Sequence, residues 1–261
     1  MPGKLLAAVS LKTYFGHRAT LDWVTRAREV SVPWLDVVDV LVVPIATALA
    51  PTVELLAGTG ILVGAQDCSW APVGAFTGEL PAEVLREVGV RVVELGHAER
   101  RSMFHEDDTT VRRKAAAAAR AGLMPMVCVG ESERLGVPAA IQTCLSQVDA
   151  ALADVPESRP AVVAYEPVWA IGAEEPADAR HIRAVCAAIR TSLAGRGYSG
   201  RVIYGGTAGP GLFATVYPDV DGLFLGRRAH DVTAFAEVLV EMGTLARQHD
   251  RGRALQLETR Q

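Results

Sequence analysis

Short apolar runs alternate with helical patterns eight times along the chain, and this alternation constrains the fold more than any other feature. The runs are continuously apolar and rich in β-branched residues, which is typical of strands that are buried on both faces. They are Leu5–Leu11, Val37–Val43, Ile61–Ala65, Val90–Leu95, Met124–Val129, Ala161–Tyr165, Arg201–Tyr204 and Gly222–Leu225. Strict alternation of strand and helix predicts a parallel sheet.

Helical periodicity fills the intervals between the runs. The helices expected there are Thr20–Val30, Thr47–Leu56, Pro81–Val88, Asp108–Ala121, Pro138–Ala153, Pro176–Ala194 and Val232–Gln248, with a shorter helix after Gly209. Thr47 is expected to cap the second helix, since its hydroxyl can accept a hydrogen bond from a free backbone N–H group.

The spacing of these units favours one architecture. Eight units in 261 residues leave roughly 33 residues per unit, which suits a closed (β/α)8 barrel. The alternative is an open doubly wound sheet, which more often carries a glycine-rich fingerprint after its first strand. Here Lys12-Thr13-Tyr14-Phe15-Gly16 follows that strand. We therefore predict an α/β fold with a single barrel domain over residues 1–261, of which 250–261 form a polar tail or a helix extension.

Composition excludes several classes of protein. Lys and Arg number 26 against 30 Asp and Glu, so the net charge is −4, and no basic run is present that would bind nucleic acid. The chain is 50% hydrophobic, which is too apolar for a disordered protein. The longest apolar candidate, 35–50, is interrupted by Asp36, Asp39 and Pro44, so no membrane helix is expected.

The four cysteines are scattered and form no C-x-x-C pair, so neither a zinc site nor a disulfide framework is expected: Cys68, Cys128, Cys144 and Cys186. The stretch 4–10 resembles a weak signal-peptide core, but it is short, and a buried strand is the preferred interpretation. These features predict a cytoplasmic, reducing location. No nucleotide motif or metal-ligand cluster is present, so no cofactor and no metal are expected.

Polar residues follow several of the predicted strands. Lys12 follows the first strand and Glu166 the sixth, while the stretches 96–101, 205–209 and 226–228 follow the fourth, seventh and eighth. In a (β/α)8 barrel the carboxyl ends of the strands meet at one mouth, where active sites are built. We therefore expect a cation, an imidazole, a carboxylate and two glycine-rich turns to converge there.

Each of these features has a functional and a structural interpretation. The glycine-rich turns either bind an anion through backbone N–H groups or are simply tight turns. Glu166 is either a general base or half of an ion pair, and His97 is either a hydrogen-bonded structural histidine or a catalytic group. Lys12 is a surface cation, a Schiff-base nucleophile or an electrostatic stabiliser, and an acidic neighbour such as Glu99 favours the last role. Taken as functional, they predict proton abstraction next to a carbonyl, through an enediolate, in a small phosphorylated substrate.

Several segments resemble the signatures of the triosephosphate isomerase family, in the same order and from about Lys4 to Gln248. They are Gly64-Ala65-Gln66-Asp67-Cys68, the stretch from Gly74 to Glu79, Gly96-His97-Ala98-Glu99-Arg100-Arg101, the stretch from Ala164 to Gly172, and Ile203-Tyr204-Gly205-Gly206-Thr207. The resemblance implies a (β/α)8 barrel enzyme that interconverts two sugar phosphates, without a cofactor, in glycolysis and gluconeogenesis.

The resemblance also implies roles for individual residues. Glu166 would be the base, neutral His97 would polarise the carbonyl, and Lys12, paired with Glu99, would stabilise the anionic substrate. Phosphate would be bound at Gly172, Gly206, Thr207, Gly226 and Arg227, with Ser10 also in the substrate site. A lid over 167–177 would close over the substrate and exclude water, through Pro167, Val168, Trp169, Ala173, Pro176 and Ala177.

Two further expectations follow from the resemblance. Glu131 is similar to the family glutamate that contacts Trp169 in the open lid. The loop 66–80 is similar to the loop that inserts beside the partner's active site in a homodimer, and an exposed apolar loop of this length favours an interface in any case. The dimer-loop residues are Trp70, Phe76, Thr77 and Glu79.

The chain departs from the family pattern around the substrate. Ser10 stands where the family has Asn, Ala98 where it has Ser, and Arg227 where it has a second Gly. The end of the lid reads Ala173-Glu174-Glu175-Pro176-Ala177, and Pro176 stiffens this hinge. Ser10 leaves either room or a lost hydrogen bond, and the Arg227 guanidinium either contacts the substrate or pairs with an acid in solvent.

Three functions are therefore open. The first is isomerisation of dihydroxyacetone phosphate and glyceraldehyde 3-phosphate. The second is isomerisation of a four-carbon keto-sugar phosphate of the erythrulose phosphate type. The third is a catalytically inactive phosphosugar-binding barrel, against which the joint presence of Lys12, His97 and Glu166 argues.

Overall fold

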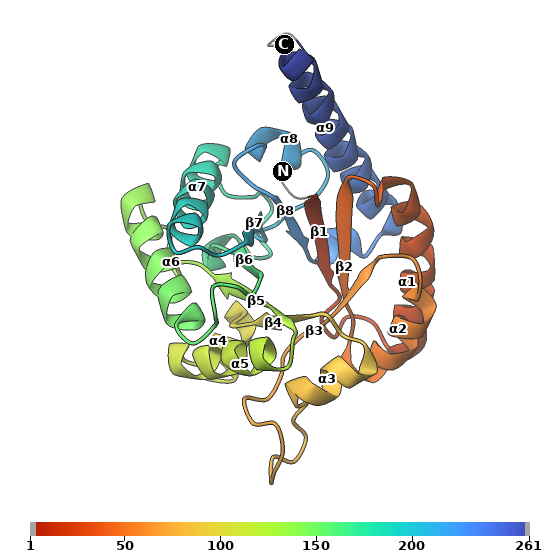
Figure 1. The fold of residues 1–261 in the computed structure, drawn as a ribbon, viewed down its shortest axis with the longest axis vertical. Helices are drawn as coiled ribbons and strands as arrows, with labels where there is room; N and C mark the ends of the chain where they lie inside the picture. Colours follow the sequence, from red (N-terminus) through yellow and green to blue (C-terminus); the bar gives the residue numbers. More distant parts are fainter. Residues whose placement is uncertain (1–3, 259–261) are drawn as a thin grey trace.

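The computed structural model describes residues 4–258, with side chains as far as residue 252. Eight parallel strands form a closed barrel, in which each strand pairs with its neighbour in sequence and the eighth pairs with the first (Figure 1). The strands are β1 (Leu5–Ser10), β2 (Val38–Val43), β3 (Leu62–Ala65), β4 (Val92–Leu95), β5 (Met124–Val129), β6 (Ala161–Tyr165), β7 (Gly200–Tyr204) and β8 (Gly222–Leu225). The predicted (β/α)8 barrel is confirmed, and all eight apolar runs form its strands.

An outer ring of helices surrounds the barrel (Figure 1). The helices are α1 (His17–Ser31), α2 (Leu49–Leu56), α3 (Ala82–Val88), α4 (Ala98–Met103), α5 (Asp108–Arg120), α6 (Val137–Leu152), α7 (Ala179–Gly195), α8 (Phe213–Val216) and α9 (Val232–Glu258). None of them, within residues 4–258, is long and apolar enough to cross a membrane. The four cysteines are all buried and free.

Two expectations about the helices are wrong, and one helix was not expected. Thr47 does not cap α2, because it lies within a 3-10 turn (Ala46–Ala48) that precedes that helix. Helix α7 begins after Pro176, since the Asp178 side chain accepts hydrogen bonds from two backbone N–H groups and caps it there. Helix α4 was not expected, because its residues were interpreted only as polar site residues. Residues 250–258 continue α9, which is the helix extension that the sequence analysis gave as one of two alternatives, and the last three residues of the chain lie outside the described residues.

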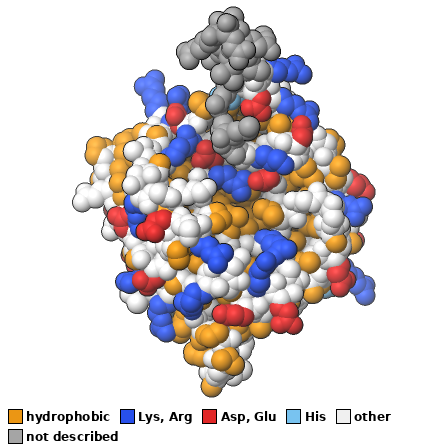
Figure 2. Space-filling model, in the orientation of Figure 1, with side chains coloured by type: hydrophobic (Ala, Val, Ile, Leu, Met, Phe, Trp, Pro, Cys, Tyr) orange, Lys and Arg blue, Asp and Glu red, His pale blue; other side chains and the backbone are white. Residues whose placement is uncertain are grey.

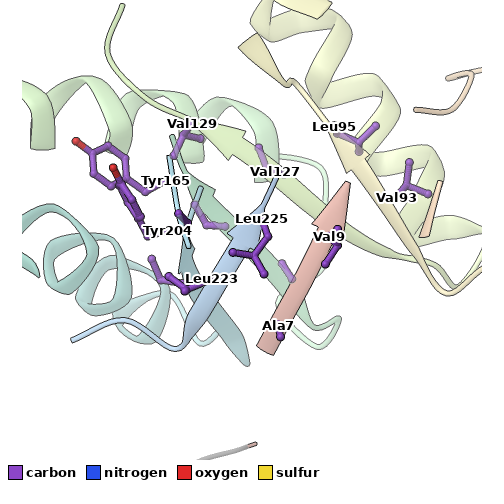
Figure 3. Packing of buried hydrophobic residues seen from close by; sticks show 14 of the residues in the cluster. Ala7, Val9, Val93, Leu95, Val127, Val129, Tyr165, Tyr204, Leu223 and Leu225 are labelled. Carbon is purple, nitrogen blue, oxygen red and sulfur yellow. The ribbon is translucent and has the colours of Figure 1, made fainter. Parts of the chain in front are cut away.

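The core has two layers because successive strand residues point to opposite sides of the barrel wall. Ala7 and Val9 of β1 pack outward against the helices, together with Tyr165 and Tyr204 (Figure 3). Leu6 and Ala8 point into the barrel and fill it, with inward residues of other strands. A residue's position in its strand therefore decides whether it meets the helices or the barrel interior.

Candidate active site

A cavity of about 460 Å³ opens at the carboxyl ends of the strands. It brings together most of the residues that the sequence predicted for the site: Ser10, Lys12, His97, Glu99, Glu166, Gly172, Ala173, Thr207, Gly226 and Arg227. It also includes Gly205 and Arg228, which belong to the stretches expected after the seventh and eighth strands, and Tyr14 and Phe224, which the sequence analysis did not name as site residues. The segments that follow β1, β4, β6, β7 and β8 therefore lie together at the carboxyl end of the barrel, as predicted. Among the described residues, no group of His, Cys, Asp and Glu is arranged to hold a metal ion.

Lys12 lies just past β1 and forms an ion pair with Glu99. Its Nζ lies 2.6 Å from Oε1 of Glu99, as the sequence analysis expected. Burial acts to lower the pKa of Lys12, but the hydrogen bond and the charge of Glu99 outweigh it and raise the pKa above its usual value. Lys12 therefore remains a cation, which suits electrostatic stabilisation and not a Schiff-base nucleophile. Its φ of +48° is unusual for a residue with a side chain, and such backbone strain is common at functional sites.

His97 lies at the amino end of α4, and its ring orientation is set by the backbone of that helix. Nδ1 accepts a hydrogen bond from the backbone N–H of Glu99 over 3.1 Å. A neutral imidazole that accepts at Nδ1 carries its proton on Nε2. Nε2 lies 3.7 Å from Oε2 of Glu166. The arrangement thus presents an N–H donor toward the carboxylate side of the cavity.

Glu166 follows β6 and is 4% exposed. Its Oε2 has no hydrogen-bond partner among the described residues, so this oxygen is available to accept a proton. The carboxylate lies against Gly205, where an added Cβ would come within 2.6 Å of Oε1. Gly205 is therefore required for the position of the carboxylate, because any side chain there would displace it.

The lid segment 167–177 lies against the loops that follow β7 and β8. The Thr207 hydroxyl donates to the carbonyl oxygens of Ala170 and Ala173, over 2.7 and 3.2 Å. At the far end, the N–H of Ala177 donates to the Tyr204 hydroxyl over 3.1 Å. Arg228 donates to the carbonyl oxygen of Glu174 over 2.7 Å. The lid thus lies over the cavity.

Trp169 anchors the first part of the lid to Glu131. Its Nε1 donates to Oε1 of Glu131 over 3.0 Å, and this carboxylate also accepts from the Tyr165 hydroxyl. The resemblance linked this contact to an open lid, but here it is made while the lid lies on the neighbouring loops. The expected pair is therefore present.

Most of the expected phosphate-binding residues line the cavity, namely Gly172, Thr207, Gly226 and Arg227, whereas Gly206 does not. Gly172, at the centre of the lid, and Thr207 both have positive φ, +73° and +34°. Gly206 is also tightly enclosed, because a Cβ there would lie 2.6 Å from the Tyr204 hydroxyl. The guanidinium of Arg227 approaches the lid, since a Cβ on Gly172 would lie 2.8 Å from its Nη2. Arg227 has no carboxylate within 4 Å among the described residues, so the alternative that it pairs with an acid is not observed.

One carboxylate of the site was missed. Glu94 in β4 is 3% exposed and accepts a hydrogen bond from the Ser10 hydroxyl over 2.9 Å. Burial raises its pKa to about 7, with the Glu166 charge acting in the same direction. The signal in the sequence was a single carboxylate inside an apolar run. A buried carboxylate requires a compensating partner, so it merited separate attention.

The loop 66–80 projects from the barrel between β3 and α3 (Figure 1). Hydrophobic side chains gather at its tip, at the lower end of the molecule in Figure 2. Val73 is 82% and Phe76 41% exposed, whereas Trp70 is half-buried between Phe76 and Arg113. Thr77 and Glu79 are exposed. The tip of this loop therefore exposes apolar side chains.

The closed barrel with a polar cavity at the carboxyl ends of its strands is the architecture of an α/β-barrel enzyme. The chain belongs to the triosephosphate isomerase family, because the family model "Triosephosphate isomerase" matches residues 5–242. The L-erythrulose-1-phosphate isomerase of Pectobacterium atrosepticum is 45% identical over 254 residues, which cover 94% of this chain and 98% of the relative. The triosephosphate isomerase of Moorella thermoacetica is 41% identical over 212 residues, covering 77% and 84%. The L-erythrulose-1-phosphate isomerase of Brucella abortus biovar 1 is 37% identical over 219 residues, covering 78% and 82%.

Proposed function

We propose that the protein isomerises L-erythrulose 1-phosphate through an enediolate, with Glu166 as the base. The proposed chemistry is supported by the position of Lys12, His97 and Glu166 around one cavity. There, Nε2 of His97 lies 3.7 Å from Oε2 of Glu166. The choice of substrate is supported by the 45% identity to an L-erythrulose-1-phosphate isomerase over nearly the whole of both chains.

The reaction moves one proton between two adjacent carbons. The free oxygen of Glu166 removes a proton from the carbon next to the carbonyl, and the C–H electron pair forms the carbon–carbon double bond of the enediolate. Nε2–H of His97 donates to the oxygen that becomes negative, and the Lys12 cation stabilises the charge that develops. Glu166 then returns the proton to the neighbouring carbon, which moves the carbonyl one position along the chain.

The chemistry of the substrate differs in one respect from the triose reaction that the sequence analysis placed first. L-erythrulose 1-phosphate carries a hydroxymethyl group on the carbon that is a terminal CH₂OH in dihydroxyacetone phosphate. An enediolate across carbons 2 and 3 therefore gives a second ketose, with its phosphate now numbered at carbon 4. The reaction is a ketose–ketose isomerisation instead of an aldose–ketose one.

The phosphate is assigned to Gly172, Gly206, Thr207, Gly226 and Arg227. The Arg227 guanidinium has no carboxylate partner among the described residues, so its charge is available for a phosphate dianion. Lys12 cannot supply this charge alone, because Glu99 already balances it. Closure of the lid over the site would exclude water and protect the enediolate from loss of phosphate.

Triosephosphate isomerisation is the second candidate, supported by the 41% identity to the Moorella thermoacetica enzyme. An inactive binding protein is disfavoured by the complete set of Lys12, His97 and Glu166 around the cavity. We further propose that two copies of the chain associate through the loop 66–80, whose tip exposes Val73 and Phe76. Sedimentation of the purified protein tests this assembly, and a monomer at micromolar concentration would contradict it.

Turnover in D₂O tests the mechanism. A base that exchanges its proton with solvent delivers deuterium to the carbon that it reprotonates, so the product should carry deuterium at that carbon. Product without deuterium would mean that hydrogen passes from one carbon to the other without exchanging with solvent. Absence of turnover on both ketose phosphates would contradict the proposed function.

A further inference from the structure

Glu94 and Ser10 both point into the barrel at its carboxyl end. In β1, Ser10 follows the inward residues Leu6 and Ala8 at a spacing of two. In β4, Glu94 follows the inward residue Val92 at the same spacing. Both side chains therefore belong to the inward-facing side of the barrel near its carboxyl end, at 2% and 3% exposure.

The hydrogen bond between them determines what Ser10 can offer to a ligand. An ionised carboxylate only accepts hydrogen bonds, so the Ser10 hydroxyl uses its single hydrogen on Oε2 of Glu94. The remaining lone pairs of Ser10 Oγ can then only accept. Since Ser10 lines the cavity, it presents an acceptor there, which pairs with a ligand hydroxyl and not with a carbonyl.

Several other polar side chains of the cavity already have partners, and Arg227 is assigned to the phosphate. Lys12 is paired with Glu99, the Thr207 hydroxyl donates to the lid, and Arg228 donates to Glu174. His97 and Glu166 are assigned to the reacting carbons. Ser10 takes part in none of these contacts. Glu94 does not line the cavity, so it can affect a bound ligand only through its neighbours.

We propose that Glu94 and Ser10 select a ketose phosphate whose reacting carbon carries an additional hydroxymethyl group, the fourth carbon of L-erythrulose 1-phosphate. Ser10 Oγ accepts a hydrogen bond from the hydroxyl of that group, and Glu94 is the positioning residue that holds Ser10 in the accepting orientation. This inference rests on the proposed function, and it names the residues that distinguish the four-carbon from the three-carbon substrate.

The position of the two residues fits this part of the substrate. The expected phosphate-binding segments belong to the lid and to the loops after β7 and β8, whereas Ser10 is the last residue of β1 and Glu94 the last but one of β4, on the inward side of the barrel. A substrate bound by its phosphate at those loops and by its reacting carbons at His97 and Glu166 directs its additional hydroxymethyl group toward this inward side. Dihydroxyacetone phosphate has no carbon there, so it cannot make the contact.

The test compares kcat/KM for L-erythrulose 1-phosphate with kcat/KM for dihydroxyacetone phosphate, expressed as a ratio. Effects of a variant on the common chemistry cancel in this ratio. Ser10→Ala and Glu94→Leu should each lower the ratio by about tenfold, as expected for a lost hydrogen bond to a substrate hydroxyl. Glu94→Leu in the Ser10→Ala background should lower it no further, because Glu94 acts through Ser10. Glu94→Gln keeps an acceptor oxygen for the Ser10 hydroxyl, so it should lower the ratio less than Glu94→Leu does.

Glu106→Gln is the matched control. Glu106 is also a buried carboxylate, but it accepts from Arg100 and Lys114 and does not line the cavity. Its replacement should leave the ratio within twofold of wild type, while circular dichroism confirms that each variant is folded. Ratios of the Ser10 and Glu94 variants within twofold of wild type would overturn this inference alone. Absence of wild-type turnover of L-erythrulose 1-phosphate would overturn the proposed substrate and this inference together.

Discussion

Nε2 of His97 lies 3.7 Å from Oε2 of Glu166, and both side chains are buried. The two groups are held from different parts of the chain, His97 by the backbone of α4 and Glu166 by the end of β6. A donor and an acceptor at this separation can act on the adjacent oxygen and carbon of one bound ketose. Their placement is the basis of the predictions that follow.

Replacing Glu166 by Gln should lower kcat by about 10² to 10⁴, the usual contribution of a positioned general base. Gln keeps the shape of the side chain but cannot take up the proton. Steady-state kinetics on both ketose phosphates measures the loss, and an unchanged melting temperature shows that the fold is intact. Near wild-type kcat in this variant would mean that another group is the base.

Gly205→Ala should lower kcat by about tenfold or more, since small displacements of a reacting group have large effects on rate. The new Cβ would lie 2.6 Å from Oε1 of Glu166 and would push the carboxylate away from the substrate. Gly136→Ala is the control, because a Cβ there meets nothing within 4 Å. If both variants keep wild-type kcat, Gly205 does not fix the position of Glu166.

Arg227→Gly should raise KM for both ketose phosphates by roughly tenfold, which corresponds to one charge-assisted hydrogen bond to phosphate. The guanidinium lies beside Gly172 of the lid, on the side assigned to the phosphate, so the two substrates should be affected alike. An equal rise in KM for both substrates would assign Arg227 to phosphate binding and not to selection between the substrates. A selective loss of four-carbon turnover would instead make Arg227 a specificity residue.

The preference for the four-carbon substrate should rise with pH through about 7. Burial raises the pKa of Glu94 to about 7, so the carboxylate that fixes Ser10 as an acceptor is present above this pH and protonated below it. The charged and titratable groups around Glu94 are Lys12, His97, Glu166 and Cys128. Their titration affects both substrates, as does that of the phosphate, and cancels in the ratio of the two kcat/KM values.

Glu94→Gln provides the comparison for this pH profile. Gln does not titrate, so the ratio of kcat/KM values should be flat between pH 6 and pH 8 in this variant. A profile with the same slope in wild type and Glu94→Gln would assign the pH dependence to another group.

The sequence predicted the barrel well, because strands buried on both faces are marked by continuous apolar runs and their spacing allows little else. It predicted that Lys12, His97 and Glu166 would line one cavity, because the carboxyl ends of the strands in such a barrel share one mouth. The predicted helix boundaries were less accurate where two residues could each mark the start of a helix. Pro176 suggested the start of a helix, but Asp178 provides the side-chain cap and determines it.

Glu94 was missed for a physical reason. Within an apolar run its neighbours Val93 and Leu95 point outward, and only the closed barrel shows that Glu94 points inward toward Ser10. The contact of Arg227 with Gly172 likewise joins segments far apart in sequence. Contacts of this kind depend on the folded arrangement of the loops, which periodicity does not encode.

The central claim is tested most directly by kcat/KM of the purified protein for L-erythrulose 1-phosphate and for dihydroxyacetone phosphate under the same conditions. A site with an acceptor for the additional hydroxyl should favour the four-carbon ketose by about tenfold or more. A higher kcat/KM for dihydroxyacetone phosphate would contradict the account and identify the protein as a triosephosphate isomerase.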